Sequence, residues 1–204
     1  PYLLKIPNRA DNSFTFTDFT LPNINSRWHY HPEIELIHIR EGRGTQFMGD
    51  NIRHFKAGDI ILVGSNLPHF WRYDQNLNAD KAEHHYSTVI HFTEKLWGEH
   101  FLQMPENVLL NNLIKNSKRG LLLQGSTRSK VARLMEKIGA CKGTYRLIHL
   151  LECLTVIAES NDYVYLSSLG FQYNASSSEH ERINAIYEYC FNHYLEKIPL
   201  DVIA

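Results

Sequence analysis

The chain has 204 residues, enough to bury a substantial hydrophobic core in one or two domains. Hydrophobic residues make up 43% of the sequence and charged residues 21%, as in an ordinary soluble globular protein. The net charge of −1 gives no bulk electrostatic attraction toward nucleic acid or an anionic membrane. No apolar run approaches the roughly 18–20 residues of a membrane span, and no signal peptide is recognisable, so we expect no membrane partner.

The cysteines indicate the compartment. Cys141, Cys153 and Cys190 are widely spaced and form no C-x-x-C pair. This usage is typical of buried thiols in a reducing environment rather than of a disulfide framework. We therefore expect a cytoplasmic protein.

From Phe14 to Phe92 the sequence has the pattern of short strands separated by turns. The strand-like runs are rich in β-branched and aromatic residues with period-two alternation: FTFTDF, EIELIHI, GTQFM, IRHF, DIILV and YSTVIHF. Gly49-Asp50-Asn51 predicts a hairpin loop, and Ala57-Gly58-Asp59 predicts a second break. Many short strands at this spacing favour an antiparallel sandwich or barrel.

The sequence period changes after Phe92. Helices are predicted over 93–104 and 105–118, the second with a proline at a favourable first position. Residues 120–125 (GLLLQG) are too short for a helix and indicate a strand or an extended link. Ser126 and Thr127 would cap a helix over 128–138, and a helix opened by Thr144 would pack against it as an antiparallel hairpin.

The second helix of this hairpin has one broad apolar face. Leu147, Leu150, Leu151 and Leu154 follow the i, i+3, i+4, i+7 spacing. A face of this width needs a partner, either the β half or a second copy of the chain. The four leucines are therefore candidates for core or for a dimer seam, and we expect a homodimer with part of the hairpin at its interface.

The last part of the sequence indicates a linker followed by a new domain. Residues 167–178 (SSLGFQYNASSS) have neither helical nor strand period. Ser178 and Glu181 then have capping-box spacing for a helix. Pro199 marks a break, and LDVIA has the character of the first turn of another helix. We expect the sequence to end within, or just inside, a further domain that begins at 179.

A histidine and glutamate constellation lies in the stretch RWHYHPEIELIHIREG. On a continuous strand, His29, His31 and Glu35 share one face, and His38 points to the other. In a small closed barrel the first face is the interior, where burying three titratable groups without partners costs several kcal/mol. These groups therefore need a metal, a polar ligand, ordered water or one another.

Imidazole and carboxylate groups suit a divalent first-row metal such as Zn, Ni, Fe or Mn. His69, in NLPHFWR, is the candidate for a fourth ligand. Trp71 shares its parity and would form an aromatic wall beside it, either as core or as a surface for a sugar or aromatic ligand. His91, in TVIHF, is a further candidate for the same interior.

The spacing of these residues resembles the two conserved motifs of the cupin superfamily. The first segment is His29-x-His31-x3-Glu35-x6-Gly42, and the second is Gly58-x5-Gly64-x-Asn66-x2-His69. The chain departs from the usual motifs at four positions. Gly64 stands where a proline is usual, Asn66 where a glycine is usual and Tyr73 where an asparagine is usual. Upstream of the first motif, Asn23 stands in place of a glycine. The resemblance implies a small β-barrel of the double-stranded β-helix type. The positions that bind metal in metal-dependent cupins carry ligand-type residues here: His29, His31, Glu35 and His69.

The order of parts resembles the AraC-type (AraC/XylS) transcription regulators. In that family a cupin sensor, here 1–93, precedes a helical dimerisation region, here 94–166, a linker and a helix-turn-helix domain, here beginning at 179. The resemblance implies that a small-molecule effector, a sugar or a small organic acid, binds in the barrel. The implied ligand-binding residues are His29, His31, Glu35, His69, Trp71 and His91. DNA would be bound only through a C-terminal domain that this sequence does not complete.

Three functional hypotheses follow. The leading one is the ligand-sensing and dimerisation region of a transcription regulator, without enzymatic activity. The alternative is a metal-dependent cupin enzyme of isomerase or dioxygenase type, which the metal-ligand set favours and the helical C-terminal half disfavours. A third is a barrel used only for oligomerisation.

Overall fold

The computed structural model describes residues 1–7, 12–20, 27–74 and 85–171, together with 186, 189, 190, 193 and 197–199. The strands are β1 (Tyr2–Leu3), β2 (Thr15–Thr20), β3 (His29–Tyr30), β4 (Ile34–Glu41), β5 (Arg43–Met48), β6 (Asn51–Lys56), β7 (Ile60–Val63), β8 (His69–Tyr73), β9 (Tyr86–Phe92), β10 (Leu121–Leu123) and β11 (Tyr163–Tyr165). The helices are η1 (Phe101–Gln103), η2 (Pro105–Asn107), α1 (Val108–Ser117), α2 (Gly125–Ala140) and α3 (Thr144–Ser160). The predicted capping box at Ser178 and the helix-turn-helix start lie outside the described residues, apart from isolated positions.

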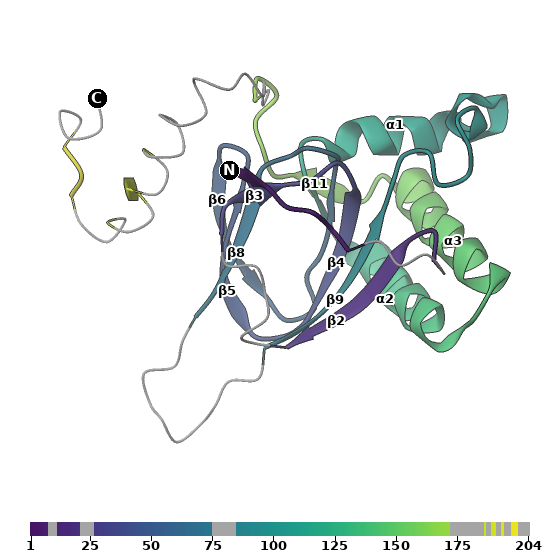
Figure 1. Cartoon of the computed structure of the whole chain (residues 1–204), viewed down its shortest axis with the longest axis horizontal. Helices are drawn as coiled ribbons and strands as arrows, with labels where there is room; N and C mark the ends of the chain where they lie inside the picture. Colours follow the sequence, from purple (N-terminus) through teal and green to yellow (C-terminus); the bar gives the residue numbers. More distant parts are fainter. Residues whose placement is uncertain are drawn as a thin grey trace.

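Two sheets face each other, and the helices pack against the outer side of one of them (Figure 1). The first sheet has five strands in the order β1-β3-β8-β5-β6, and the second has six in the order β11-β10-β7-β4-β9-β2. β1 and β3 are parallel, and the other described strand pairs are antiparallel. The predicted class, a mainly β fold followed by helices, is confirmed.

β4 is buried on both faces. Its residues Ile34 and Leu36 belong to the core that the six-stranded sheet shares with the helices, whereas Ile37 and Ile39 belong to the core between the sheets. Successive side chains of a strand point to opposite faces, so one strand supplies both cores. β7 and β9 alternate in the same way. The two-sided burial explains why these strands have nearly continuous apolar sequences.

The stretch that begins at His29 is not one continuous strand, so that premise of the prediction is wrong. β3 ends at Tyr30 and pairs with β8 in the five-stranded sheet, whereas β4 begins at Ile34 and pairs with β7 and β9 in the six-stranded sheet. Pro32 lies in the bend between them. Proline lacks the amide N–H that a central strand position requires, which explains the break.

The helical predictions match the structure unevenly. The helix over 105–118 is confirmed as η2 and α1, α3 begins at Thr144 as predicted, and 120–125 contains β10. The prediction of a helix over 93–104 is wrong, because these residues form turns and the short η1. Gly98, at φ +101°, adopts a left-handed conformation that ends any right-handed helix there.

The predicted cap of α2 is also wrong. The helix begins at Gly125, so Ser126 and Thr127 lie inside its first turn, and Gln124 at the N-cap makes no side-chain capping bond. Gly125, at φ +49°, begins the helix earlier than the capping pattern indicates. α2 and α3 pack against each other as the predicted hairpin.

The segment after position 94 completes the six-stranded sheet. β10 pairs with β7, and β11 pairs with β10, so the chain returns to the sheet before and after the helical hairpin. One buried core contains residues of this sheet and of α1, α2 and α3. The helices are therefore held to the sheet by shared packing as well as by chain connectivity.

The predicted leucine face lies largely inside this core. Leu150 and Leu154 are 0% and 1% exposed, and Leu147 and Leu151 are partly buried against the same cluster. Large apolar residues that remain exposed near the starts of α1 and α3 are Met104, Val108, Leu109, Tyr145 and Ile148. The homodimer stays a prediction, and these residues, rather than Leu150 and Leu154, are available to a partner.

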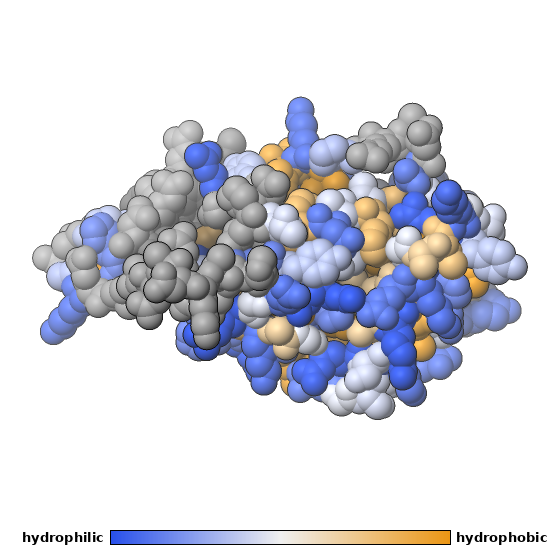
Figure 2. Space-filling view, turned by 90° about the horizontal axis from the view of Figure 1, so that it is seen from below, coloured by the Kyte–Doolittle hydropathy of each residue, from blue (hydrophilic) through white to orange (hydrophobic). Residues whose placement is uncertain are grey.

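Apolar residues do not dominate the described surface seen in Figure 2. On that face hydrophilic and apolar residues are interspersed. None of the described helices combines the length and apolarity that crossing a membrane requires.

The burial of Leu150 predicts a large loss of stability on truncation. Replacing Leu150 with alanine should lower the free energy of unfolding by about 2–5 kcal/mol, because a cavity remains in a core shared by sheet and helices. Ile148→Ala, on the same helix but 50% exposed, should change it by no more than about 0.5 kcal/mol. Urea unfolding followed by circular dichroism measures both. Equal effects of the two substitutions would contradict this assignment of the core.

Candidate ligand and metal site

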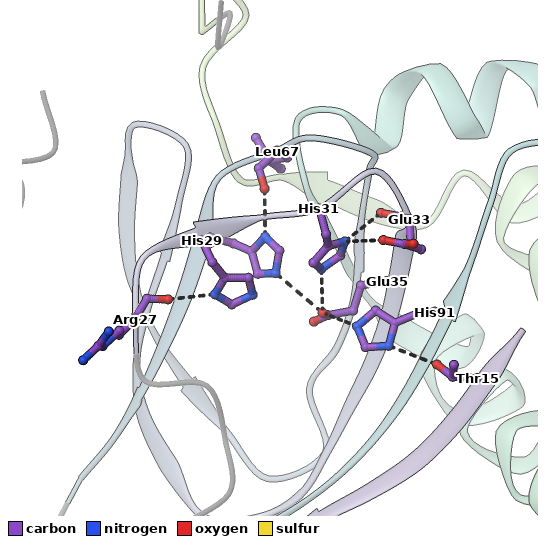
Figure 3. A network of polar contacts seen from close by, with 9 residues as sticks. Thr15, Arg27, His29, His31, Glu33, Glu35, Leu67 and His91 are labelled. Atoms are coloured by element: carbon purple, nitrogen blue, oxygen red, sulfur yellow. Dashed lines mark hydrogen bonds and ion pairs between the residues drawn. The ribbon is translucent and has the colours of Figure 1, made fainter. Parts of the chain in front are cut away.

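Three buried imidazoles are each anchored through Nδ1 to a backbone carbonyl two residues away (Figure 3). The bonds run from His29 to Arg27 at 2.7 Å, from His31 to Glu33 at 3.0 Å and from His69 to Leu67 at 2.8 Å. Because a carbonyl oxygen only accepts hydrogen bonds, each Nδ1 carries a proton, and each Nε2 of a neutral ring keeps its lone pair. Metal-binding histidines are commonly oriented by this kind of bond.

The carboxylate of Glu35 lies where these rings converge (Figure 3). Its Oε2 is 3.0 Å from Nε2 of His91, 3.3 Å from Nε2 of His31 and 3.5 Å from Nε2 of His69. Thr15 contacts Nδ1 of His91 at 3.2 Å on the far side of that ring. One buried carboxylate oxygen therefore faces three imidazoles.

The two sheets contribute to this cluster in pairs. Glu35 on β4 is the direct cross-strand partner of His91 on β9, and His29 on β3 is the direct partner of His69 on β8. Side chains directly opposite each other on adjacent antiparallel strands lie close together. Because the two sheets face each other, the pairs meet in the interior, and His31 joins them from the bend between β3 and β4.

The charges in the cluster are strongly coupled. Burial opposes ionisation of Glu35, but the hydrogen bond from His31 and the interactions with His69 and His91 outweigh it and hold the pKa of the carboxyl well below its usual range. Burial likewise opposes charge on His31, yet Glu35 raises its pKa above 6.5. Burial, reinforced by His69, lowers the pKa of His29 to about 3. Burial therefore favours the neutral form of His29, whereas the mutual interaction of Glu35 and His31 favours the charged form of each.

The donor set fits a divalent metal ion. Among the described residues, two groups bring their ligand atoms within 4.8 Å of one another: His29, His31 and His69, and His31, Glu35 and His91. Nε2 of His69 is buried without a hydrogen bond, since its 3.5 Å contact with Glu35 lacks hydrogen-bond geometry. A buried polar atom without a hydrogen-bond partner is uncommon in proteins. A metal ion bound at this nitrogen would give it a partner. Imidazole and carboxylate ligands together suit Zn, Ni, Fe or Mn.

A cavity of about 710 Å³ lies beside the cluster. His29, Glu35 and His91 form part of its wall, together with Trp71, which is 4% exposed. Further apolar side chains line it: Leu4, Ile6, Pro7, Phe14, Phe16, Phe19, Ile37 and Val89. The arrangement can enclose a small organic molecule against an apolar wall with a polar end.

The six residues predicted to bind a ligand are gathered in one region. His29, Glu35, Trp71 and His91 line the cavity, whereas His31 and His69 belong to the cluster but are not part of the cavity wall. The predicted metal set did not include His91, which contacts Glu35 more closely than His31 does. The available signal in the sequence was parity: His91 and Val89 are both odd-numbered, so on one strand they share a face. His38 lies on the opposite face of β4, as its parity predicts, yet it is buried.

Sequence reasoning missed much of the cavity wall. Residues 4–7 reach it because β1 pairs with β3 and places the N-terminal segment beside the cluster. β2 forms another wall as the edge strand next to β9. Arg146 comes from α3, more than a hundred residues after the first motif. No local pattern in the sequence connects these segments with the histidines.

A cupin-domain model matches residues 21–79 of the chain. The match covers both motifs and confirms that this part is a cupin domain. No curated protein matches the chain.

AraC-like regulators are among the solved structures to which the chain is similar. The AraC-like transcriptional activator CuxR is 11% identical with a TM-score of 0.48, and the match covers 84% of this chain and 55% of CuxR. ToxT from Vibrio cholerae, bound to (E)-4-(8-methylnaphthalen-1-yl)but-3-enoic acid, is 11% identical with a TM-score of 0.48, covering 94% of this chain and 70% of ToxT. A cupin 2 conserved barrel domain protein from Rhodopseudomonas palustris is 15% identical with a TM-score of 0.32, covering 43% and 57%. The chain spans about half the length of CuxR.

The neutral, buried His29 predicts a loss of stability in mild acid. Its pKa is about 3 in the folded chain and 6.5 as the ordinary value, so the unfolded chain binds the proton first and stability falls as pH drops below 6.5. Between pH 6.5 and pH 5 this loss amounts to as much as about 2 kcal/mol. Glu35 contributes its own loss mainly below about 4.5, the ordinary pKa of its carboxyl. The raised pKa of His31 acts in the opposite direction, because the folded chain binds that proton more tightly, and it offsets part of the loss from His29.

Urea unfolding at pH 7 and pH 5, with chelator present, tests this expectation. His29→Gln should reduce the acid-induced loss, whereas His54→Gln, at an exposed position, should leave it unchanged. His38, whose pKa is lowered to about 4 by burial, accounts for a further part of the loss in both variants. An unchanged pH dependence in His29→Gln would contradict the assignment.

Proposed function

We propose that this chain is the ligand-sensing region of an AraC-type transcription regulator, and that a small molecule binds in the cavity of its cupin domain. The observation that carries the proposal is the cavity of about 710 Å³, walled by both sheets, by the N-terminal segment and by α3. The resemblance of the sequence to the AraC-type order of parts supports it. In this proposal dimerisation uses the helical region, and DNA is bound by a separate domain of the regulator.

The position of the cavity suits a sensor. The cavity is lined by residues 4–7, by β2 and by Arg146 of α3, so a ligand that fills it would contact all three segments. α3 also packs in the core shared by the six-stranded sheet and the other helices. A ligand shifts a conformational equilibrium only by binding two states differently. Contacts with both the N-terminal segment and a helix give such differential binding a structural basis.

We also propose that the histidine cluster holds a divalent metal ion. His29, His31, His69 and Glu35 would be its ligands, and the backbone carbonyls bonded to the three Nδ1 atoms would orient the rings. A bound metal would supply a Lewis-acidic positive charge at the polar end of the cavity. The second candidate function, a metal-dependent cupin enzyme, rests on this same donor set.

A reporter assay tests the sensor function. The whole chain is joined to a DNA-binding domain that lacks its own dimerisation function, and transcription is measured across a panel of sugars and organic acids. At least one compound should change transcription by about tenfold, a typical size for coupling between two sites. Thr17→Trp, which fills part of the cavity, should abolish the response. Thr20→Trp, on the same strand outside the cavity wall, should preserve it.

If no compound in the panel changes transcription, the sensor function is contradicted. A response that survives Thr17→Trp would place the sensing site elsewhere. The barrel would then serve for oligomerisation alone.

Metal content and turnover separate the sensor from the enzyme. Protein dialysed against Zn²⁺, Ni²⁺, Fe²⁺ or Mn²⁺ should retain about one ion per chain by elemental analysis. His31→Ala should lose it, because His31 belongs to both ligand groups, and exposed His54→Ala should retain it. Metal without turnover agrees with the regulator, and turnover that depends on the metal supports the enzyme. Absence of bound metal would contradict the metal site.

A further inference from the structure

The cavity wall identifies the chemical class of its ligand. We infer that the cavity binds an organic acid with an aromatic or otherwise apolar body, and that the guanidinium of Arg146 holds its carboxylate. The inference rests on the proposed function and narrows it, because the sequence leaves open whether the ligand is a sugar or an acid.

Arg146 lines the cavity with a charge that no described carboxylate pairs. Its Nη1 donates to Oδ1 of Asn12 at 2.9 Å, and its guanidinium lies over the ring of Phe14, 4.7 Å from the centroid. Both partners are neutral. In the described part of the chain no carboxylate forms a salt bridge with this side chain. A guanidinium has five N–H donors, so several remain for a planar carboxylate.

The place of Arg146 in α3 is unfavourable for a cation. It lies in the first turn of the helix, which has no acidic residue. The helix dipole makes this end positive, so it disfavours a cation and favours an anion. Since the ring of Phe14 and one amide hold the guanidinium at the cavity wall, a bound carboxylate would relieve this repulsion.

The other charged groups of the wall agree with an anionic ligand. Lys5, from the N-terminal segment, is a second cation, and it is exposed. The two carboxylates of the wall already have donors. Glu35 faces its histidines, and Asp18 accepts a hydrogen bond from Thr88 at 2.7 Å. Within the described ranges, the two cations of the wall have no carboxylate partner and its two carboxylates have donors, so the wall is complementary to negative charge.

The remaining wall suits an apolar body better than a sugar. The rings of Phe14, Phe16, Phe19 and Trp71 contribute flat apolar surface. The indole N–H of Trp71 is buried and has no hydrogen-bond partner in the part of the chain that the structure describes. Trp71, Arg146 and Lys5 all donate and cannot accept. Asn12, Thr15 and Thr17 of the wall can also accept. The preference for an apolar body therefore rests on the four rings, and the preference for an acid rests on the available donors.

Isothermal titration with paired probes tests the inference on the unmodified chain. The probes are benzoate, phenylacetate, 3-phenylpropionate and 4-phenylbutyrate, each compared with its neutral amide, and arabinose as the sugar. The best acid should bind at least about tenfold more tightly than its amide, as expected for a charge-assisted hydrogen bond. Equal binding of acid and amide, tighter binding of arabinose, or no binding by any of the acids would overturn the inference.

Variants of Arg146 locate the carboxylate. Arg146→Gln should weaken binding of the acid about tenfold and change binding of the amide by less than about twofold. Arg146→Lys should retain part of the selectivity for the acid. Arg133→Gln removes an exposed arginine from the neighbouring α2 and should have no effect. Thermal unfolding of each variant checks the fold. Lys5→Gln removes the second cation of the wall, at an exposed position, as an independent comparison. Full selectivity in Arg146→Gln would overturn the assignment.

The outcomes distinguish this inference from the proposed function. If the reporter responds to a neutral sugar and the acids do not bind, the sensor function stands and the inference fails. If an acid binds through Arg146 and transcription does not change, the ligand class stands and the sensor function fails.

Discussion

The structure depends on one constraint, the burial of β4 on both faces. Its even-numbered residues pack toward the helices, and its odd-numbered residues point into the space between the sheets. Glu35 is one of the odd-numbered residues, so the strand that builds the helical core also carries the central carboxylate of the site. Since a shift of one residue would exchange the two faces, the packing of the helices fixes the register that keeps Glu35 in the interior.

Burial of that carboxylate determines the chemistry of the site. A lone buried charge is costly, and the cluster compensates by directing imidazole nitrogens at one oxygen of Glu35. The backbone carbonyls that bond the Nδ1 atoms of His29, His31 and His69 fix how these rings are presented. The result is a preorganised polar end on a cavity that is otherwise mostly apolar. Pockets that bind small molecules are commonly preformed in this way.

Local patterns predicted the elements whose sequence carries a strong period. The strands from FTFTDF to YSTVIHF and the helix from Thr144 follow from alternation and amphipathicity. The predictions failed where backbone geometry overrode the pattern. Pro32 divides the first histidine motif between two sheets, and Gly98 replaces an expected helix by turns. The six residues predicted to bind a ligand were chosen from spacing and resemblance, and the structure gathers them in one region. Ligand binding by them stays a prediction, and the assumption of a single strand behind His29 and Glu35 was wrong.

The sequence by itself determined the cupin motifs, the two halves of different period and the residue types able to form a polar cluster. Only the tertiary structure decided which oxygen the histidines share, that His91 is among them and that Leu150 and Leu154 are core. It also decided that Arg146 of α3 and the N-terminal segment wall the same cavity. The physical reason is that sequence period reports one element's burial, whereas contacts between remote elements depend on how sheets and helices pack.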